Sequence, residues 1–192
     1  MKYFSLCLLA ALCFFNSCKT SKPVSAATTL APVAEQQADT YYKTEVKYSD
    51  QSTWLLGYLS PVQLTSLPHS DWYLRGLDSY QPGSDALNKL LSVATDSVSI
   101  KIVLGTWCPD SRREVPRFMK ILSLWQFPVS KVTFIGVDNQ KLSPIGEYES
   151  LDIQRVPTFI LYKNKIEAGR IIENPVTSLE QDMVNILTGI KK

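Results

Sequence analysis

Residues 98–113 have the sequence VSIKIVLGTWCPDSRR, and this stretch decides which fold the chain is predicted to adopt. Residues 98–104 are almost wholly apolar and rich in β-branched side chains, which is typical of a buried strand. Gly105 breaks that run, and Pro109 suits the first turn of a helix because its missing N–H is not needed there. The stretch therefore predicts a strand, a short turn and a helix, with Cys108 at the helix N-terminus.

Strands and helices alternate on both sides of this stretch. A helical pattern begins at Ser84 and Asp85, and the helix after Cys108 carries its apolar side chains on one face. Further strands are predicted at 131–137, 158–162 and 166–172, and helices at 109–126, 144–151 and 177–187. This order predicts an α/β fold in residues 85–192, with a central mixed sheet flanked by helices.

Residues 41–84 are expected to form an N-terminal extension that packs on this domain. The segment is rich in aromatic rings, which need a surface to cover them, and prolines break it into short pieces. Ser60 before Pro61 predicts one helix start, and a second helix is predicted around residues 70–79. We therefore expect a helical and irregular extension.

Residues 1–40 are interpreted as an export and anchoring segment. Lys2 precedes an apolar run that has the length of a signal-peptide core and is too short to cross a bilayer. A small residue before Cys18 resembles a bacterial lipoprotein cleavage site, which predicts a signal peptide at 1–17 and a lipid on Cys18. Residues 18–40 predict a flexible linker. We expect an exported protein anchored to the cell envelope, facing the periplasm or on the outer membrane; the alternative is an ordinary signal peptide with an incidental cysteine.

The chain has 192 residues, four cysteines and a formal net charge of +2. If Cys7 and Cys13 are removed with the signal and Cys18 carries a lipid, Cys108 is the single free thiol of the mature protein. The charge pattern shows no block of Lys and Arg, and the cysteine spacing matches neither a metal site nor a disulfide framework. We therefore expect no nucleic-acid partner, no metal and no cofactor.

The position of Cys108 predicts a reactive thiol. Unpaired N–H groups and the helix dipole at a helix N-terminus favour the thiolate, which is the nucleophilic form of cysteine. Arg112 and Arg113 add positive charge within one turn, whereas the Asp110 carboxylate opposes thiolate formation unless it points to solvent. The alternative is a small buried cysteine at a strand end, although residues 105–113 are polar and turn-like.

The sequence WCPDS at 107–111 resembles the Trp-Cys-x-x-Cys motif of the thioredoxin family, with serine replacing the second cysteine. Pro116 lies eight residues after Cys108, where thioredoxins carry a helix-kinking proline, and RVPTF at 155–159 is similar to the loop that holds their cis-proline. The stretch GTWCPDSRREVPRF also resembles a subgroup of exported bacterial thioredoxin-like proteins, particularly from Bacteroidetes. The resemblance covers roughly residues 85–190 and implies a thioredoxin-like fold.

The resemblance implies thiol–disulfide exchange through Cys108, with exported protein disulfides as substrates or a thiol-reducing protein as partner. Ser111 is implied to donate a hydrogen bond to the thiolate. Val156 is implied to offer backbone groups that pair with an extended peptide beside the sulfur. The other residues implied to shape the substrate groove are Trp107, Pro109, Asp110 and Pro157.

Two departures from the family pattern change the expected chemistry. Ser111 cannot supply the second thiol with which a dithiol enzyme releases its mixed disulfide. Ile102 stands where thioredoxins carry a buried aspartate. Both departures favour a monothiol, isomerase-like exchange over a general disulfide reductase.

Two functions without catalysis stay open. The chain is either a peptide-binding or partner-binding module whose Cys108 is a relic or a sensor, or a structural envelope lipoprotein that uses residues 41–84 as a partner surface. His69, the one histidine of the chain, is expected to be a surface or packing residue. Four acidic residues are expected to be solvated helix charges, namely Glu114, Glu147, Glu149 and Asp152.

Overall fold

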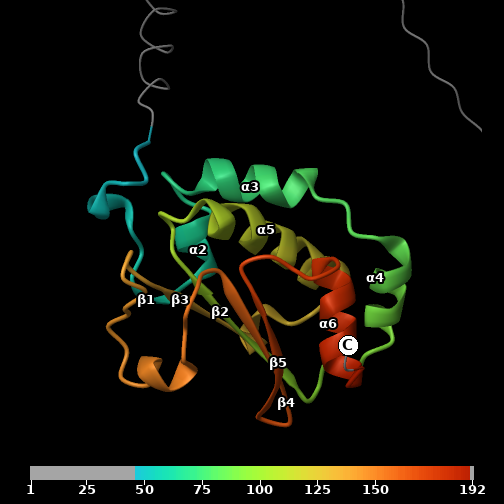
Figure 1. Cartoon of the computed structure of the whole chain (residues 1–192). Helices are drawn as coiled ribbons and strands as arrows, with labels where there is room; N and C mark the ends of the chain where they lie inside the picture. Colours follow the sequence, from blue (N-terminus) through green and yellow to red (C-terminus); the bar gives the residue numbers. More distant parts are fainter. Residues whose placement is uncertain (1–45, 191–192) are drawn as a thin grey trace, which may run out of the picture. The chain divides into compact units, whose positions relative to one another are not determined.

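The computed structural model describes residues 46–190 of the chain (Figure 1). The predicted signal peptide, the lipidation site at Cys18 and the linker lie outside the described residues, as does the start of the extension. Among the helices of residues 46–190, none combines the length and the apolar character needed to cross a membrane.

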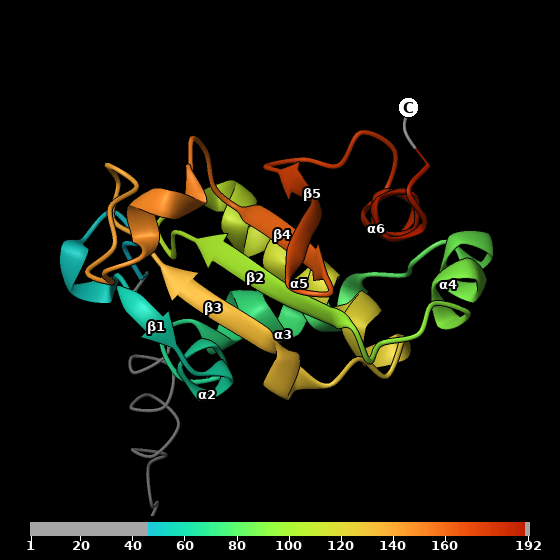
Figure 2. The same cartoon turned by 90° about the horizontal axis from the view of Figure 1, so that it is seen from below.

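The described strands form one mixed sheet in the order β1-β3-β2-β4-β5 (Figure 2). β2 runs parallel to β3 and antiparallel to β4, and the edge strands β1 and β5 are antiparallel to their neighbours. This arrangement confirms the predicted α/β class with a central mixed sheet. The strand bounds are β1 Gly57–Leu59, β2 Val98–Leu104, β3 Val132–Gly136, β4 Thr158–Lys163 and β5 Ile166–Ile172.

Helices flank the sheet, and most of their predicted starts are confirmed. The helices are α2 (Pro61–Leu64), α3 (Ser70–Ser79), α4 (Ser84–Leu91), α5 (Pro109–Leu124) and α6 (Leu179–Thr188). Single 3-10 turns are η1 (Gln51–Thr53), η2 (Val129–Lys131) and η3 (Tyr148–Leu151). The helix predicted at 144–151 is reduced to η3, since Pro144 and Gly146 disfavour helix in the first part of that segment.

The sheet is buried on both faces. Ile100, Ile102 and Leu104 of β2 belong to the larger apolar cluster, which also includes side chains of α5 and α6. Val103 belongs to a second cluster that includes side chains of β3, η3 and β4. Because successive strand residues point to opposite faces, this split explains why the sequence of β2 is a nearly continuous apolar run.

The extension contributes a strand that the sequence did not predict. β1 pairs antiparallel with β3, and Gly57 lies opposite Gly136. A Cβ atom on Gly136 would lie 2.1 Å from the carbonyl oxygen of Leu55, so the backbone of the extension approaches β3 closely. A strand of three residues is too short to show a period of two in the sequence, which is why we expected only helical and irregular structure there.

The extension also covers α5, because its helix α3 runs along α5 (Figure 1). A Cβ atom on Gly76 of α3 would lie 2.4 Å from Cγ of Pro116, so this glycine permits the close approach of the two helices. Tyr73 of α3 is buried in the larger cluster. The proline inside α5 is therefore a packing surface for the extension.

The expectation that Glu114 is a solvated helix charge is wrong. The residue is only 3% exposed on α5. Its Oε1 accepts hydrogen bonds from Arg113 Nε at 2.6 Å and from Arg117 Nη1 at 3.0 Å. Two neighbouring guanidinium groups compensate the carboxylate, which allows it to be buried on the packed side of the helix.

Candidate functional site

Cys108 is the N-cap residue of α5, as predicted from the sequence. Its backbone is extended, with φ −78° and ψ 123°, and Pro109 begins the helix. The Cys108 N–H donates to the Gly105 carbonyl at 2.9 Å, and its own carbonyl accepts the first helical hydrogen bond, from the Arg112 N–H, at 3.1 Å. A tight turn at the end of β2 therefore places the thiol at the start of α5.

The sulfur faces the loop before β4. The Cys108 thiol donates to the Val156 carbonyl, with an Sγ–O distance of 3.3 Å. The Val156–Pro157 peptide bond is cis, as the sequence analysis expected. The structure thus brings together Cys108, Val156 and Pro157, which are far apart in the sequence.

The surroundings of the sulfur are more apolar than the sequence suggested. Cys108 is 6% exposed and belongs to the second apolar cluster with Val103, Ile135 and Val156. Residues 105–113 were expected to be polar and turn-like, yet several of their members are buried. Those buried members are Gly105, Thr106, Cys108 and Ser111.

Ser111 is fully buried one turn into α5. Its Oγ accepts a hydrogen bond from the Gly105 N–H at 3.2 Å, which fixes the turn between β2 and the helix. The hydrogen bond of the Cys108 thiol goes to the Val156 carbonyl. A hydrogen bond from Ser111 to the sulfur therefore stays a prediction. The bond between Ser111 and Gly105 stabilises the turn.

Trp107 covers the turn that precedes Cys108. Its indole Nε1–H donates to the Val137 carbonyl at 3.0 Å, which ties the turn to the end of β3. A Cβ atom on Gly105 would lie 2.5 Å from Cε2 of that indole, so a glycine is needed beneath the ring. The Trp54 ring of the extension lies 6.3 Å from the Trp107 ring, between centroids.

Two charged groups of the first turn of α5, Asp110 and Arg113, pair with each other. Arg113 bonds to Asp110 at 2.7 Å and to Asn174 Oδ1 at 2.5 Å. Asp110 is about one-third exposed, and Pro109 beside it is exposed. The Asp110 carboxylate is thus paired with a guanidinium at the start of α5.

Arg112 and Tyr48 complete the site through contacts that the sequence did not predict. Arg112 Nη1 donates to the carbonyls of Thr106 and Trp107, at 3.0 Å each. The ring of Tyr48 covers the guanidinium, with Cζ 4.3 Å from the ring centroid. Nothing local in the sequence connects Tyr48 with Arg112; the aromatic richness of residues 41–84 was the one available signal.

His69 lies in the extension, buried between the rings of Tyr48 and Trp72. Burial lowers the pKa of His69, and the nearby Arg112 guanidinium lowers it further. Both effects disfavour the charged imidazolium, which fits the expected packing role. Within residues 46–190, no group of three His, Cys, Asp or Glu side chains is arranged to hold a metal ion.

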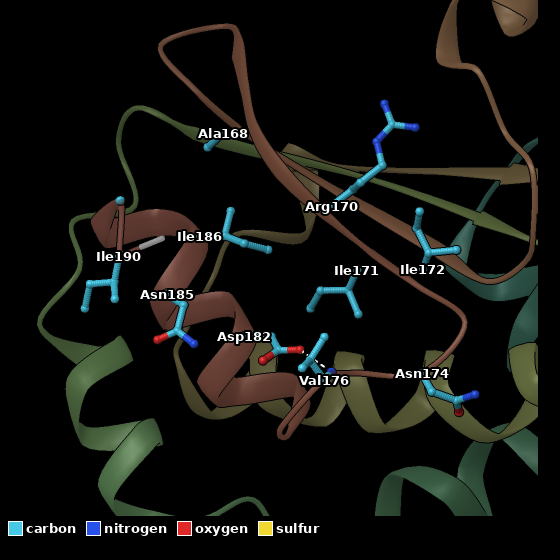
Figure 3. Close-up of a pocket in the computed structure, with 11 residues that line it drawn as sticks. Ala168, Arg170, Ile171, Ile172, Asn174, Val176, Asp182, Asn185, Ile186 and Ile190 are labelled. Atoms are coloured by element: carbon cyan, nitrogen blue, oxygen red, sulfur yellow. Dashed lines mark hydrogen bonds between the residues drawn. The ribbon is translucent and has the colours of Figure 1, made fainter. Parts of the chain in front are cut away.

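A separate groove lies between β5 and α6 (Figure 3). It has a volume of about 480 Å³ and an apolar floor that includes Ile171 and Ile186. Asp182 bonds to the Val176 N–H at its side, with a distance of 2.6 Å. None of the residues predicted to act with Cys108 lines this groove.

Comparisons with known proteins give no family for this chain. No family model matches it. No curated protein matches it either. One solved structure, a Pseudomonas aeruginosa protein of unknown function, aligns with 64% of this chain and 84% of its own, at 13% identity and a TM-score of 0.46.

Proposed function

We propose that Cys108 performs monothiol thiol–disulfide exchange, of a reductase or isomerase kind, on exported proteins. The observation that carries this proposal is the position of its sulfur at the start of α5, 3.3 Å from the Val156 carbonyl oxygen. A helix N-terminus favours the thiolate, and a backbone carbonyl beside the sulfur lies where an extended peptide could pair. The mature protein is proposed to act from the cell envelope, anchored by a lipid on Cys18.

We also propose that the described domain has a thioredoxin-like fold. Three placements support this assignment. The thiol follows β2 and starts α5, Pro116 lies within that helix, and Pro157 precedes the hairpin of β4 and β5, after which α6 ends the domain. β1, the edge strand from the extension, and α3, the extension helix along α5, are additions to the segment that resembles the family.

The proposed reaction begins when the Cys108 thiolate attacks one sulfur of a substrate disulfide. A mixed disulfide forms as the substrate S–S bond breaks, and the second substrate sulfur leaves as a thiolate that takes up a proton. A different substrate thiolate then attacks the substrate sulfur of the mixed disulfide, forms a new substrate disulfide and releases Cys108. This cycle transfers no net electrons, so it rearranges disulfides without an external oxidant or reductant.

Trp107, Pro109 and Asp110 are proposed to form the rim that a substrate meets first. Pro109 is exposed, and the other two are partly exposed beside the buried sulfur. A substrate that pairs with the backbone at Val156 would replace the bond between the thiol and that carbonyl. Pro157 holds the other wall, where its carbonyl accepts the Glu173 N–H at 2.7 Å.

A peptide-binding or partner-binding module without catalysis is the second candidate function. The low exposure of Cys108 and its apolar neighbours favour this candidate, because structural cysteines are commonly buried in such surroundings. In that case the loop before β4 would still bind extended chains, but the thiol would not exchange.

The experiment that separates the two candidates uses a secreted ribonuclease with scrambled disulfides as substrate. A full chain carrying Cys7→Ser, Cys13→Ser and Cys18→Ser, in which Cys108 is the one remaining cysteine, is compared with the same chain carrying Cys108→Ser as well, and the recovery of ribonuclease activity is followed. We expect the chain that retains Cys108 to accelerate recovery and the chain that also carries Cys108→Ser to have no effect. Equal recovery with both chains would rule out exchange and leave the binding module.

A further inference from the structure

We propose that residues 48–55 of the extension, together with Arg112, form a positioning clamp on the Cys108 loop (residues 105–108) and that this clamp sets the rate of disulfide exchange. The inference rests on the exchange activity proposed above and names residues that act through the loop. Arg112 and Tyr48 are its two central members. The extension would then be part of the reactive site as well as of the fold.

Arg112 holds the two peptide units that precede the reactive residue. One nitrogen of its guanidinium, Nη1, donates at 3.0 Å to the carbonyl oxygens of both Thr106 and Trp107. Hydrogen bonds from a charged donor are stronger than neutral ones. Because Cys108 follows directly, the direction of its Cα–Cβ bond depends on the two peptide units that Arg112 holds.

Tyr48 holds Arg112 in place from the extension. The Tyr48 ring stacks 4.3 Å from the guanidinium carbon, within the range of a cation–π contact. Tyr48 is itself held by two hydrogen bonds, one to its side chain and one to its backbone. Its hydroxyl donates to the Pro68 carbonyl at 2.7 Å, and its backbone carbonyl accepts the indole N–H of Trp54 at 3.0 Å.

The rest of the clamp contacts Thr106. The Leu55 N–H donates to Thr106 Oγ1 at 3.2 Å, and that hydroxyl donates to the Thr53 carbonyl at 3.4 Å. The Trp54 ring approaches the Trp107 ring from the same segment. The extension thus contacts both residues that precede Cys108 and the arginine that binds their carbonyls.

The opposite wall of the site is held without the extension. Thr158 Oγ1 donates to the Arg155 carbonyl at 2.6 Å, and the Glu173 N–H donates to the Pro157 carbonyl at 2.7 Å. The clamp therefore acts on the distance between Cys108 Sγ and the Val156 carbonyl oxygen through the Cys108 loop, and the opposite loop is held independently of it. Small errors in the position of a reacting group slow a reaction strongly, by up to about 100-fold for 1 Å.

The test measures two rates on the full chain, with adducts assigned to Cys108 by peptide mass. The first is mixed-disulfide formation with glutathione disulfide, which requires an aligned attack on an S–S bond. The second is alkylation by iodoacetamide, a small reagent that attacks from many directions. A clamp defect should slow the first rate more than the second, whereas a general loss of folded protein would change both together.

Tyr48→Leu removes the ring from the guanidinium, and Tyr48→Phe keeps the ring but removes the bond to Pro68. We expect exchange to slow about 10-fold in the first variant and to stay within about 2-fold in the second. Arg112→Leu should slow exchange by at least as much as Tyr48→Leu does. Arg113→Leu is the charge-matched control, because it removes one positive charge from the same turn without touching the loop carbonyls, and we expect little change in the ratio of the two rates.

The outcomes separate the two proposals. A wild-type chain that forms no mixed disulfide at Cys108 would overturn both the exchange activity and the clamp. A reactive wild-type chain whose Tyr48→Leu and Arg112→Leu variants keep the wild-type ratio of rates would overturn the clamp alone. Equal slowing in Arg112→Leu and Arg113→Leu would also overturn it, because charge rather than position would then set the rate.

Discussion

The two loops that meet at Cys108 are held in different ways. The loop before β4 is fixed by neighbours within the sheet, through the bonds of Thr158 to Arg155 and of Glu173 to Pro157. The loop before α5 is held from within its own domain by the bonds between Gly105 and Ser111 and between Trp107 and Val137, and also from the extension by Tyr48 and its neighbours. The loop before β4 is therefore held within the sheet, whereas the loop before α5 also depends on the extension.

Because the extension contacts the reactive loop, we expect the two to respond together to mutation. Changes in the extension should alter both stability and the reactivity of Cys108. Changes to the exposed ion pair of Arg155 and Glu173 beside the loop before β4, which spare Val156 and Pro157, should alter both properties little.

Gly76→Ala should destabilise the protein by opening the contact between α3 and α5. The added Cβ would lie 2.4 Å from Pro116 Cγ, so α3 must shift away from α5. Overpacking of this kind costs about 1–3 kcal/mol in free energy of unfolding, which outweighs the better helix propensity of alanine. Denaturant unfolding measures the loss, and Gly146→Ala is the control, because a Cβ there meets nothing within 4 Å. Equal stability of the two variants would contradict the close contact between the extension and α5.

Glu180→Gln should weaken the other end of the extension. Tyr80 and the Gly83 N–H both donate to the Glu180 carboxylate, at 2.8 Å each. Burial acts to raise the pKa of Glu180, but these and other hydrogen bonds outweigh burial and lower it below 4.5. Since hydrogen bonds to a charged group contribute about 1.5–3 kcal/mol, we expect a loss of that order near neutral pH.

The pH dependence of Glu180 has a definite sign. Because its pKa is lower in the folded state, its stabilisation is complete above pH 4.5 and is lost as the pH falls through the folded-state pKa. The difference in free energy of unfolding between wild type and Glu180→Gln should therefore shrink in acid. Glu149→Gln, an exposed carboxylate, is the control and should cost little at any pH. A difference that stays constant in acid would exclude this role of the carboxylate.

His69 should also make the free energy of unfolding depend on pH, in a higher pH range than Glu180 and by a smaller amount. Its pKa lies below 6.5 in the folded protein because burial, and then Arg112, disfavours the imidazolium. The stability associated with the neutral ring is complete above pH 6.5 and is lost as the pH falls towards the folded-state pKa. Free energies of unfolding between about pH 8 and about pH 5 should decline for wild type and be flatter for His69→Phe. Parallel curves would show that His69 does not titrate as the structure implies.

Arg155→Gln should have the smallest effect. Its ion pair with Glu173 measures 2.9 Å, but the arginine side chain is 66% exposed. Exposed pairs of this kind contribute at most about 1 kcal/mol and often nothing measurable. Thermal unfolding and the rate of disulfide exchange should both stay near wild type. A large decrease in either would show that the wall before β4 is not held by the sheet alone.

The sequence was sufficient for the central elements because their patterns are long and local. The apolar run of β2, the glycine after it and the proline that begins α5 predicted the place of Cys108 correctly. β1 was missed because a strand of three residues is too short to show an alternating pattern of apolar and polar side chains. The burial of Glu114 was missed because it depends on hydrogen bonds from two arginines, which the spacing of apolar residues does not reveal. The contact of Tyr48 with Arg112 joins segments distant in the chain, and such contacts depend on packing rather than on local sequence.

Cys108 is proposed to exchange with the disulfides of exported proteins. The most direct test is to express the full chain with an affinity tag in a bacterium that exports it, quench thiols with N-ethylmaleimide and map the state of Cys108 by mass spectrometry. We predict a reductant-sensitive fraction in which Cys108 is joined to cysteine peptides of exported proteins, and its disappearance in Cys108→Ser. Recovery of Cys108 solely as the maleimide adduct of a free thiol would contradict the account.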